Sequence, residues 1–305
     1  MKKSAIESVS LGAFVLVFTF FSLWLSVFMD QKVETALAFV LILSFGVLHG
    51  ANDIKLIQAA KEREGRHLDF KTVLVYYSIF IFASAAVFVF LPSFALLMFV
   101  LFSGYHFGEQ HWVDKAVGHQ KWAKIFYLVY GLLILFLLFN AHAAQVADVV
   151  QSICGHWLPQ VFFKNGLYLF GALSLGLGAF LFIKKALLFH VPKQLFFVLV
   201  LFVLFETASL LWGFAIYFVF WHSLPSMVDQ ITFLYGGVRA ATIRKYVWSS
   251  LPYWLASVIG MGVVLYVFRE NLVEALAFFF AFLAAITFPH VLVIGGLNKK
   301  RKEQP

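Results

Sequence analysis

The chain alternates between long apolar runs and short polar segments that carry most of its charges. Several runs approach or exceed the roughly 20 residues that an α-helix needs to cross a bilayer. They are apolar on all sides, as expected for helices surrounded by lipid or by other helices. Charged, proline and glycine positions divide the runs into ten predicted membrane spans. Their approximate limits are 7–29, 34–58, 71–91, 93–112, 122–140, 165–185, 194–211, 212–234, 250–268 and 272–296.

Two of these divisions are weak, at 91–93 and near Gly213, and merging the helices there would give eight spans. The first run has a basic start but is too long for a signal peptide, and no small-residue cleavage site follows it, so we expect a span. The sequence shows neither an internal repeat nor a low-complexity linker. It therefore predicts an all-α fold, a polytopic transmembrane helical bundle in which residues 1–305 form a single integral membrane domain.

Composition and charge agree with this interpretation. Hydrophobic residues make up 62% of the chain and charged residues 12%, whereas soluble domains average about 25% charged residues. With the N-terminus inside, all but Lys32, Lys164 and Arg269 of the 23 Lys and Arg residues fall in inner segments. The positive-inside rule therefore predicts a multi-pass protein of the inner (plasma) membrane with both termini in the cytoplasm.

The basic residues are spread over short loops, so the net charge of +8 does not indicate a nucleic-acid partner. The single cysteine, Cys154, excludes an intrachain disulfide and any metal site with several cysteines.

Four histidines lie inside or at the edge of predicted spans: His49, His106, His222 and His290. In the ten-span arrangement all four are on helices that run from outside to inside. With a rise of about 1.5 Å per residue, three of them lie at similar depth, and His222 is deeper. Ionisable side chains in hydrocarbon normally face the protein interior and have a partner. Four imidazoles converging in the cytoplasmic half of a bundle are typical of a metal site.

Carboxylates follow three of these histidines at helical spacing. Asp53 comes four residues after His49, and Glu109 three after His106. Asp229 comes seven residues after His222. Each pair would share a helix face. Because a metal-bound imidazole usually donates its other N–H to an oxygen, these acids are candidates for orienting the histidines.

Two other interpretations remain open on these residues alone. Intramembrane histidines also form hydrogen bonds between helices. Buried histidines and carboxylates mark ion pathways as well, which would indicate a transporter with histidines in its transport path.

The four histidine segments, LHGANDIKL, YHFGEQHW, FWHSLPSM and FPHVLVI, resemble the signature segments of the Brp/Blh family of membrane β-carotene 15,15'-dioxygenases. Their order along the chain also agrees with that family. The resemblance implies an enzyme of retinal biosynthesis that uses Fe(2+) and O2 to split the central double bond of β-carotene into two retinal molecules. Retinal would then be available to a rhodopsin.

The resemblance assigns the catalytic iron to His49, His106 and His222. The family pattern places one more histidine four residues after the third, where this chain has Ser226. The iron site would then be completed by His290 or by water, or it would have three histidines only. Alternatively, this protein acts on another polyene or lipid. Because carotenoids dissolve in bilayers, we expect an apolar tunnel that opens to lipid.

Overall fold

The computed structural model describes residues 5–303, which are almost entirely helical. The α-helices are α1 Ala5–Ser26, α2 Gln31–Leu41, α3 Asp53–Glu62, α4 Phe70–Phe90, α5 Pro92–Trp112, α6 Gln120–Ala141, α7 Ala143–Cys154, α8 Gln160–Ile183, α9 Val191–Thr207, α10 Leu210–Ile216, α11 Leu224–Tyr235, α12 Ala240–Val267 and α13 Leu272–Glu303. Two π-helices, η1 Ile42–Gly46 and η3 Tyr217–Ser223, and one 3₁₀-helix, η2 Val113–Lys115, complete the helical elements of the described residues. The all-α class predicted from the sequence is confirmed.

Six helical segments of the described range are long and apolar enough to cross a membrane. They are α4, α6, α8, the continuous segment Leu210–Tyr235, α12 and the Val273–Asn298 part of α13. The other expected spans correspond to α1, α2 with η1, α5 and α9, which are shorter, interrupted or more polar. The structure therefore supports a multi-pass helical membrane protein with six clear candidates, and the ten-span arrangement stays a prediction.

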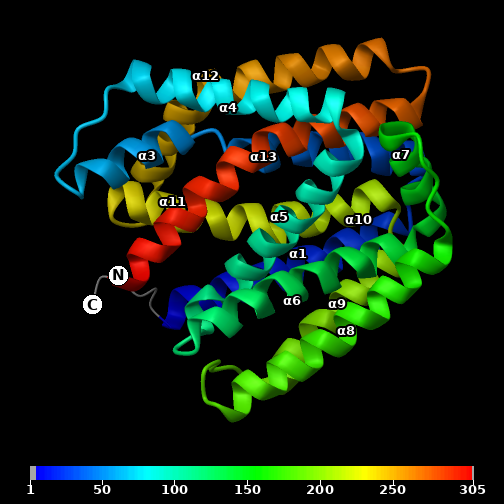
Figure 1. Ribbon diagram of the computed structural model, residues 1–305, viewed down its shortest axis with the longest axis horizontal. Coiled ribbons are helices and arrows are strands. Elements are labelled where there is room, and N and C mark those ends of the chain that lie inside the picture. The colour runs from blue at the N-terminus through cyan, green and yellow to red at the C-terminus, as the bar shows by residue number, and fades with distance from the viewer. Residues whose placement is uncertain (1–4, 304–305) are drawn as a thin grey trace.

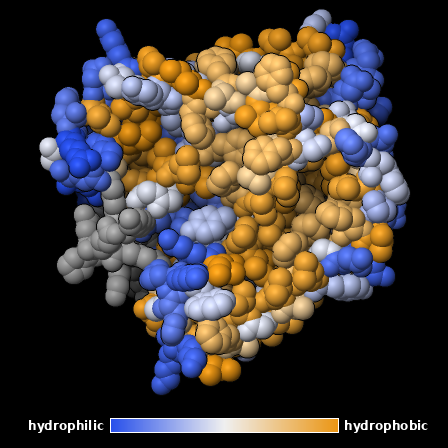
Figure 2. Space-filling view, viewed as in Figure 1, coloured by the Kyte–Doolittle hydropathy of each residue, from blue (hydrophilic) through white to orange (hydrophobic). Residues whose placement is uncertain are grey.

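The helices lie roughly along the long axis of the molecule (Figure 1). Connections after α3, α5, α8 and α11 gather at the left end of this view, and those after α4, α6, α7 and α12 at the right. Figure 2 shows a broad apolar surface between these ends and hydrophilic residues toward them. The connections predicted to be inner and those predicted to be outer therefore lie at opposite ends, and their orientation across a membrane stays a prediction. Residues 1–4 and 304–305, which that prediction also uses, lie outside the described range.

Two predicted boundaries were wrong. The span predicted over 34–58 breaks at residues 49–52, where a non-helical turn separates η1 from α3. The helix break predicted near Gly213 lies instead at 208–209, where the buried Glu34 carboxylate accepts a hydrogen bond from the Ser209 N–H at 3.2 Å. That bond satisfies a backbone donor at the start of α10. The segment between the spans predicted at 122–140 and 165–185 contains a further helix, α7, whose apolar positions Val146, Ala147 and Val149 are buried.

The core is built on α6 and on the continuous segment formed by α10, η3 and α11, most of whose residues are buried. Helix α5 packs on α6 with almost no space between the backbones. A Cβ on Gly108 would lie 1.8 Å from the Tyr127 carbonyl oxygen, and one on Gly131 would lie 1.7 Å from the Gly104 oxygen. Such close approach requires glycine. This contact fixes the depth and rotation of α5.

Substituting Gly108 with alanine should therefore force α5 and α6 apart. We expect destabilisation above the roughly 1–3 kcal/mol of ordinary overpacking, because the clash is with backbone. Thermal unfolding of the purified protein in detergent measures this. Gly176→Ala is the matched control, since a Cβ there meets nothing within 4 Å. Equal melting temperatures for the two variants would contradict the close α5–α6 contact.

Single cysteines placed at the two ends of the molecule should react from opposite sides of a membrane. Val117 and Trp157 suit this test because they are about equally exposed, 58% and 59%. In a Cys154→Ser background, a membrane-impermeant maleimide should label only one of Val117→Cys and Trp157→Cys in intact cells. Both should react after the cells are opened. Labelling of both variants in intact cells would exclude a membrane between these positions.

Candidate metal centre

The structure brings together the four histidines that the sequence singles out, each from a different segment. His49 lies in the turn after η1, His106 in α5, His222 in η3 and His290 in α13. All four are buried, with at most 5% of each residue exposed. Four helical segments that are distant in sequence therefore meet at one point inside the bundle.

The imidazole rings face one another closely. The ring centroid of His49 lies 5.1 Å from that of His222 and 4.7 Å from that of His290. The centroid of His106 lies 4.6 Å from that of His222 and 5.3 Å from that of His290. Ligand nitrogens of His49, His222 and His290 all lie within 4.8 Å of one another. Nitrogens on opposite sides of one ion would be about 4.2 Å apart, so small ring movements would bring these three around a single metal.

Most of the ring nitrogens in this cluster have no hydrogen-bond partner among the described residues. This holds for Nε2 of His49 and His290, and for both nitrogens of His106 and His222. A buried polar atom left unpaired costs about 1–3 kcal/mol. Such a concentration of unpaired atoms at one point requires an explanation. A metal ion that accepts the nitrogen lone pairs provides one, so the residues present fit a metal site.

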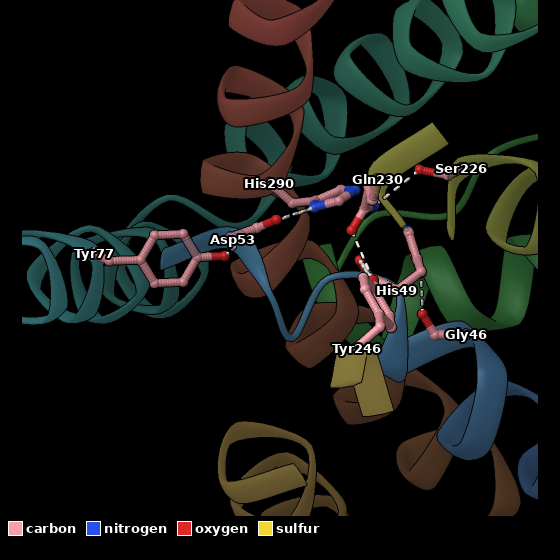
Figure 3. A network of polar contacts seen from close by, with 8 residues as sticks. All are labelled: Gly46, His49, Asp53, Tyr77, Ser226, Gln230, Tyr246 and His290. Atoms are coloured by element: carbon pink, nitrogen blue, oxygen red, sulfur yellow. Dashed lines mark hydrogen bonds and ion pairs between the residues drawn. The ribbon is translucent and has the colours of Figure 1, made fainter. Parts of the chain in front are cut away.

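Two of the histidines are oriented from behind by an oxygen (Figure 3). Nδ1 of His49 contacts the Gly46 carbonyl oxygen. Nδ1 of His290 lies 2.9 and 3.0 Å from the two Asp53 oxygens. Metal-bound histidines commonly donate their second N–H in this way. With Nδ1 protonated, Nε2 of each ring has its lone pair free toward the cluster.

Two of the four histidines depend on π-helical geometry. Residues 42–46 form η1, which ends two helical residues before the His49 turn, and His222 lies within η3. The two elements touch, since a Cβ on Gly46 would lie 2.7 Å from a ring carbon of Phe218. A π-helix holds an extra residue in a turn, and such insertions are frequent at functional sites. Here they direct His49 and His222 toward each other.

Asp53 orients a different histidine from the one expected. The prediction paired it with His49 through a continuous helix, but residues 49–52 form a turn and a new helix begins at Asp53. The i,i+4 relation therefore does not apply. The carboxylate instead lies against His290 and also accepts a hydrogen bond from the Tyr77 hydroxyl at 2.6 Å.

The other two acids predicted to orient histidines bind elsewhere. Glu109 accepts hydrogen bonds from Tyr105 at 3.1 Å and Asn298 at 3.0 Å. Asp229 accepts one from Gln110 at 3.1 Å. Neither acid bonds to a nitrogen of His106 or His222, both of which are without partners among the described residues. Shared helical spacing was too coarse a criterion, because the acids turn to neighbouring helices.

Ser226 is buried, but it belongs to a neighbouring polar network. Its hydroxyl accepts a hydrogen bond from Gln230 at 3.1 Å, and Gln230 accepts one from Tyr246 at 2.7 Å. The Tyr246 hydroxyl also lies 3.2 Å from the His49 carbonyl oxygen. Ser226 is thus connected to the cluster through the backbone of the His49 turn (Figure 3). The sequence contains no pattern that would have linked Gln230 or Tyr246 to this turn.

All four histidines line one cavity of about 830 Å³. Its remaining walls are mostly apolar side chains from α4, α5, α6, α8, α10 and α13. Along α5 the lining extends from Ser93 to His106, which corresponds to about 20 Å at 1.5 Å per residue. Lining residues such as Leu97 and Leu169 are both 54% exposed, so the cavity reaches the apolar surface of the protein. The size lies within the range of small-molecule sites.

Residues 40–298, most of the chain, match the family of β-carotene 15,15'-dioxygenases. Neither the curated proteins nor the solved structures include a significant match.

Removing one of the three histidines whose ligand nitrogens lie within 4.8 Å of one another should weaken metal binding by more than about 100-fold, since even indirect contributors typically account for 10–100-fold. We expect this for His49→Ala, His222→Ala and His290→Ala, measured as metal content after loading and gel filtration. His67→Ala is the control, because its side chain is 83% exposed at the surface. Stoichiometric metal in the three cluster variants would contradict the site.

Proposed function

The chain belongs to the β-carotene 15,15'-dioxygenase family, and we propose that it cleaves the central double bond of β-carotene with O2 to give two molecules of retinal. Each carbon of the broken bond takes one oxygen atom, so that O2 supplies both aldehyde groups. The observation that carries this proposal is the cluster of four buried imidazoles with unpaired nitrogens that opens into a long apolar cavity.

The cofactor we propose is Fe(2+), which when bound supplies the O2 chemistry that protein side chains lack. His49, His106, His222 and His290 would hold it. All four are neutral ligands, so the site adds no negative charge and the ion keeps its double positive charge. Neutral imidazole suits iron, although it also suits zinc, copper and nickel. Iron is therefore chosen on the family's reaction and not on the donor set alone.

The cavity favours a hydrocarbon substrate. Apolar walls give a polyene an environment like the bilayer, whereas a polar molecule entering them would lose its hydrogen bonds to water. The same walls exclude water from the histidine cluster. Phe107 and Phe218 line the cavity beside His222, with ring centroids 4.8 and 5.7 Å from the imidazole. They can hold a conjugated chain next to the cluster.

We propose that the substrate enters from lipid, since exposed apolar residues of α5 and α8 form part of the cavity lining. The protein would be a multi-pass protein of the inner (plasma) membrane, with the basic loops and both termini in the cytoplasm. The retinal formed would leave to the bilayer, where a rhodopsin can take it up. The sorting of connections to two ends of the molecule supports this topology.

Ser226 favours a second candidate substrate. The family histidine expected at that position is absent, which would suit a related oxygenase that acts on another polyene or lipid. A panel of carotenoids incubated with purified protein, with aldehyde products identified by mass spectrometry, distinguishes the two. Family membership favours either oxygenase over the transporter considered from the buried histidines.

Cells that make β-carotene should lose their orange colour and accumulate retinal when they express this protein. His49→Ala should reduce retinal more than about 100-fold by removing a proposed ligand. His67→Ala should bleach the cells as the unchanged protein does. Retinal is measured by chromatography, and ¹⁸O2 labelling with immediate reduction of the aldehyde should place label in both products. Persistent orange cells that contain folded, iron-loaded protein would refute β-carotene as the substrate.

A further inference from the structure

His290 is held by a chain of two hydrogen-bonded residues from two other helices (Figure 3). Nδ1 of His290, in α13, lies 2.9 and 3.0 Å from the oxygens of Asp53, at the start of α3. The Tyr77 hydroxyl, in α4, donates to Asp53 Oδ2 at 2.6 Å. Asp53 is 2% exposed and His290 4%, so the contact between these two residues is buried, while Tyr77 is partly buried.

The directions of these hydrogen bonds determine which nitrogen of His290 is free. The Tyr77 hydroxyl donates to Asp53, and both Asp53 oxygens lie against Nδ1 of His290, an arrangement in which the carboxylate accepts both hydrogen bonds. The proton in the contact between Asp53 and His290 then belongs to Nδ1. The lone pair is therefore on Nε2, which has no hydrogen-bond partner among the described residues. His290 lines the cavity.

This support distinguishes His290 from two of its neighbours. His106 and His222 have no hydrogen-bond partner on either ring nitrogen among the described residues, so packing alone orients them. Ser226, where a further histidine was expected, is bonded to Gln230. The bundle thus orients one additional imidazole by a hydrogen bond to a buried carboxylate and uses position 226 for a different network.

Tyr77 also lines the cavity. It is the second donor to a carboxylate that is buried in an apolar bundle, and such a group needs all its acceptor sites satisfied. Without the Tyr77 hydroxyl, the Asp53 carboxylate would accept one fewer hydrogen bond and could rotate away from His290. The hydroxyl of Tyr77 therefore acts on His290 through the angle and position of the Asp53 carboxylate.

We propose that Tyr77 is a positioning residue that acts through Asp53. It holds His290 in the orientation in which this imidazole completes the metal site, in a chain that has Ser226 where the family pattern has a histidine. The inference rests on the proposed metal site and identifies how one of its nitrogen donors is oriented. It makes Tyr77 part of a relay of three residues, although Tyr77 itself touches neither metal nor reacting atoms.

The test compares Tyr77→Phe with Tyr76→Phe in the full chain, purified in detergent. Tyr76 is the matched control, because it is the neighbouring residue of α4 and is 71% exposed. Affinity for Fe²⁺ is measured without oxygen by competition with a coloured chelator, and the absorption bands of bound Co²⁺ report ligand geometry. Tyr77→Phe should weaken Fe²⁺ binding by up to about 10-fold and change the Co²⁺ spectrum, and Asp53→Asn by about 10–100-fold. Tyr76→Phe should match the unchanged protein in both.

Two further measurements separate positioning from a purely structural role. In a His290→Ala background, Tyr77→Phe should have no additional effect on Fe²⁺ affinity, because the relay then has no end point. An equal loss in both backgrounds would overturn the proposal. So would a lower melting temperature of the metal-free protein with unchanged Fe²⁺ affinity and Co²⁺ spectrum.

These measurements need no carotenoid, so they are independent of the proposed reaction. If the unchanged protein binds iron and shows the Tyr77 effect but forms no retinal, the relay stands and the proposed substrate fails. If it forms retinal while Tyr77→Phe binds iron as tightly as the unchanged protein, the relay fails and the function stands.

Discussion

The central constraint on this structure is that buried imidazole nitrogens need hydrogen-bond or metal partners. A bundle of apolar helices gains nothing by burying four histidines at one point, since lipid and apolar side chains offer no hydrogen bonds. The described residues supply an acceptor to only two of the four rings, at His49 and His290. The remaining nitrogens converge on the same small volume. A cation there removes the conflict between the sequence and its surroundings, so the metal is also expected to stabilise the fold.

Irregular helix geometry makes this convergence possible. Regular α-helices would carry His49 and Asp53 on one face, but the η1 segment and the turn at residues 49–52 separate them. His49 then faces His222 in η3, while Asp53 is free to meet α13. The close α5–α6 packing at Gly108 and Gly131 fixes the helix that carries His106. Irregular and close-packed backbone thus gathers around the site, where the proposed function requires precise positions.

The apolar cavity and the polar cluster are complementary parts of one site. The cavity would offer a hydrocarbon the same environment as the bilayer, and the four histidines form a polar part of its wall. Positioning therefore falls to shape and to aromatic neighbours such as Phe107 and Phe218. Tyr77 connects the two parts, because it lines the cavity and is bonded to the carboxylate behind His290.

The sequence alone determined the helical class, the apolar spans and the four histidines, because hydropathy and residue chemistry act locally and are visible in order along the chain. It also marked Asp53 as a carboxylate near one of these histidines. Only the tertiary structure decided that Asp53 hydrogen-bonds to His290 and to Tyr77. It also decided that Glu109 and Asp229 accept hydrogen bonds from residues of other helices. Those choices depend on π-helical turns and on the rotation of helices about one another. Both arise from packing between residues that are far apart in the chain, which periodicity within one helix cannot express.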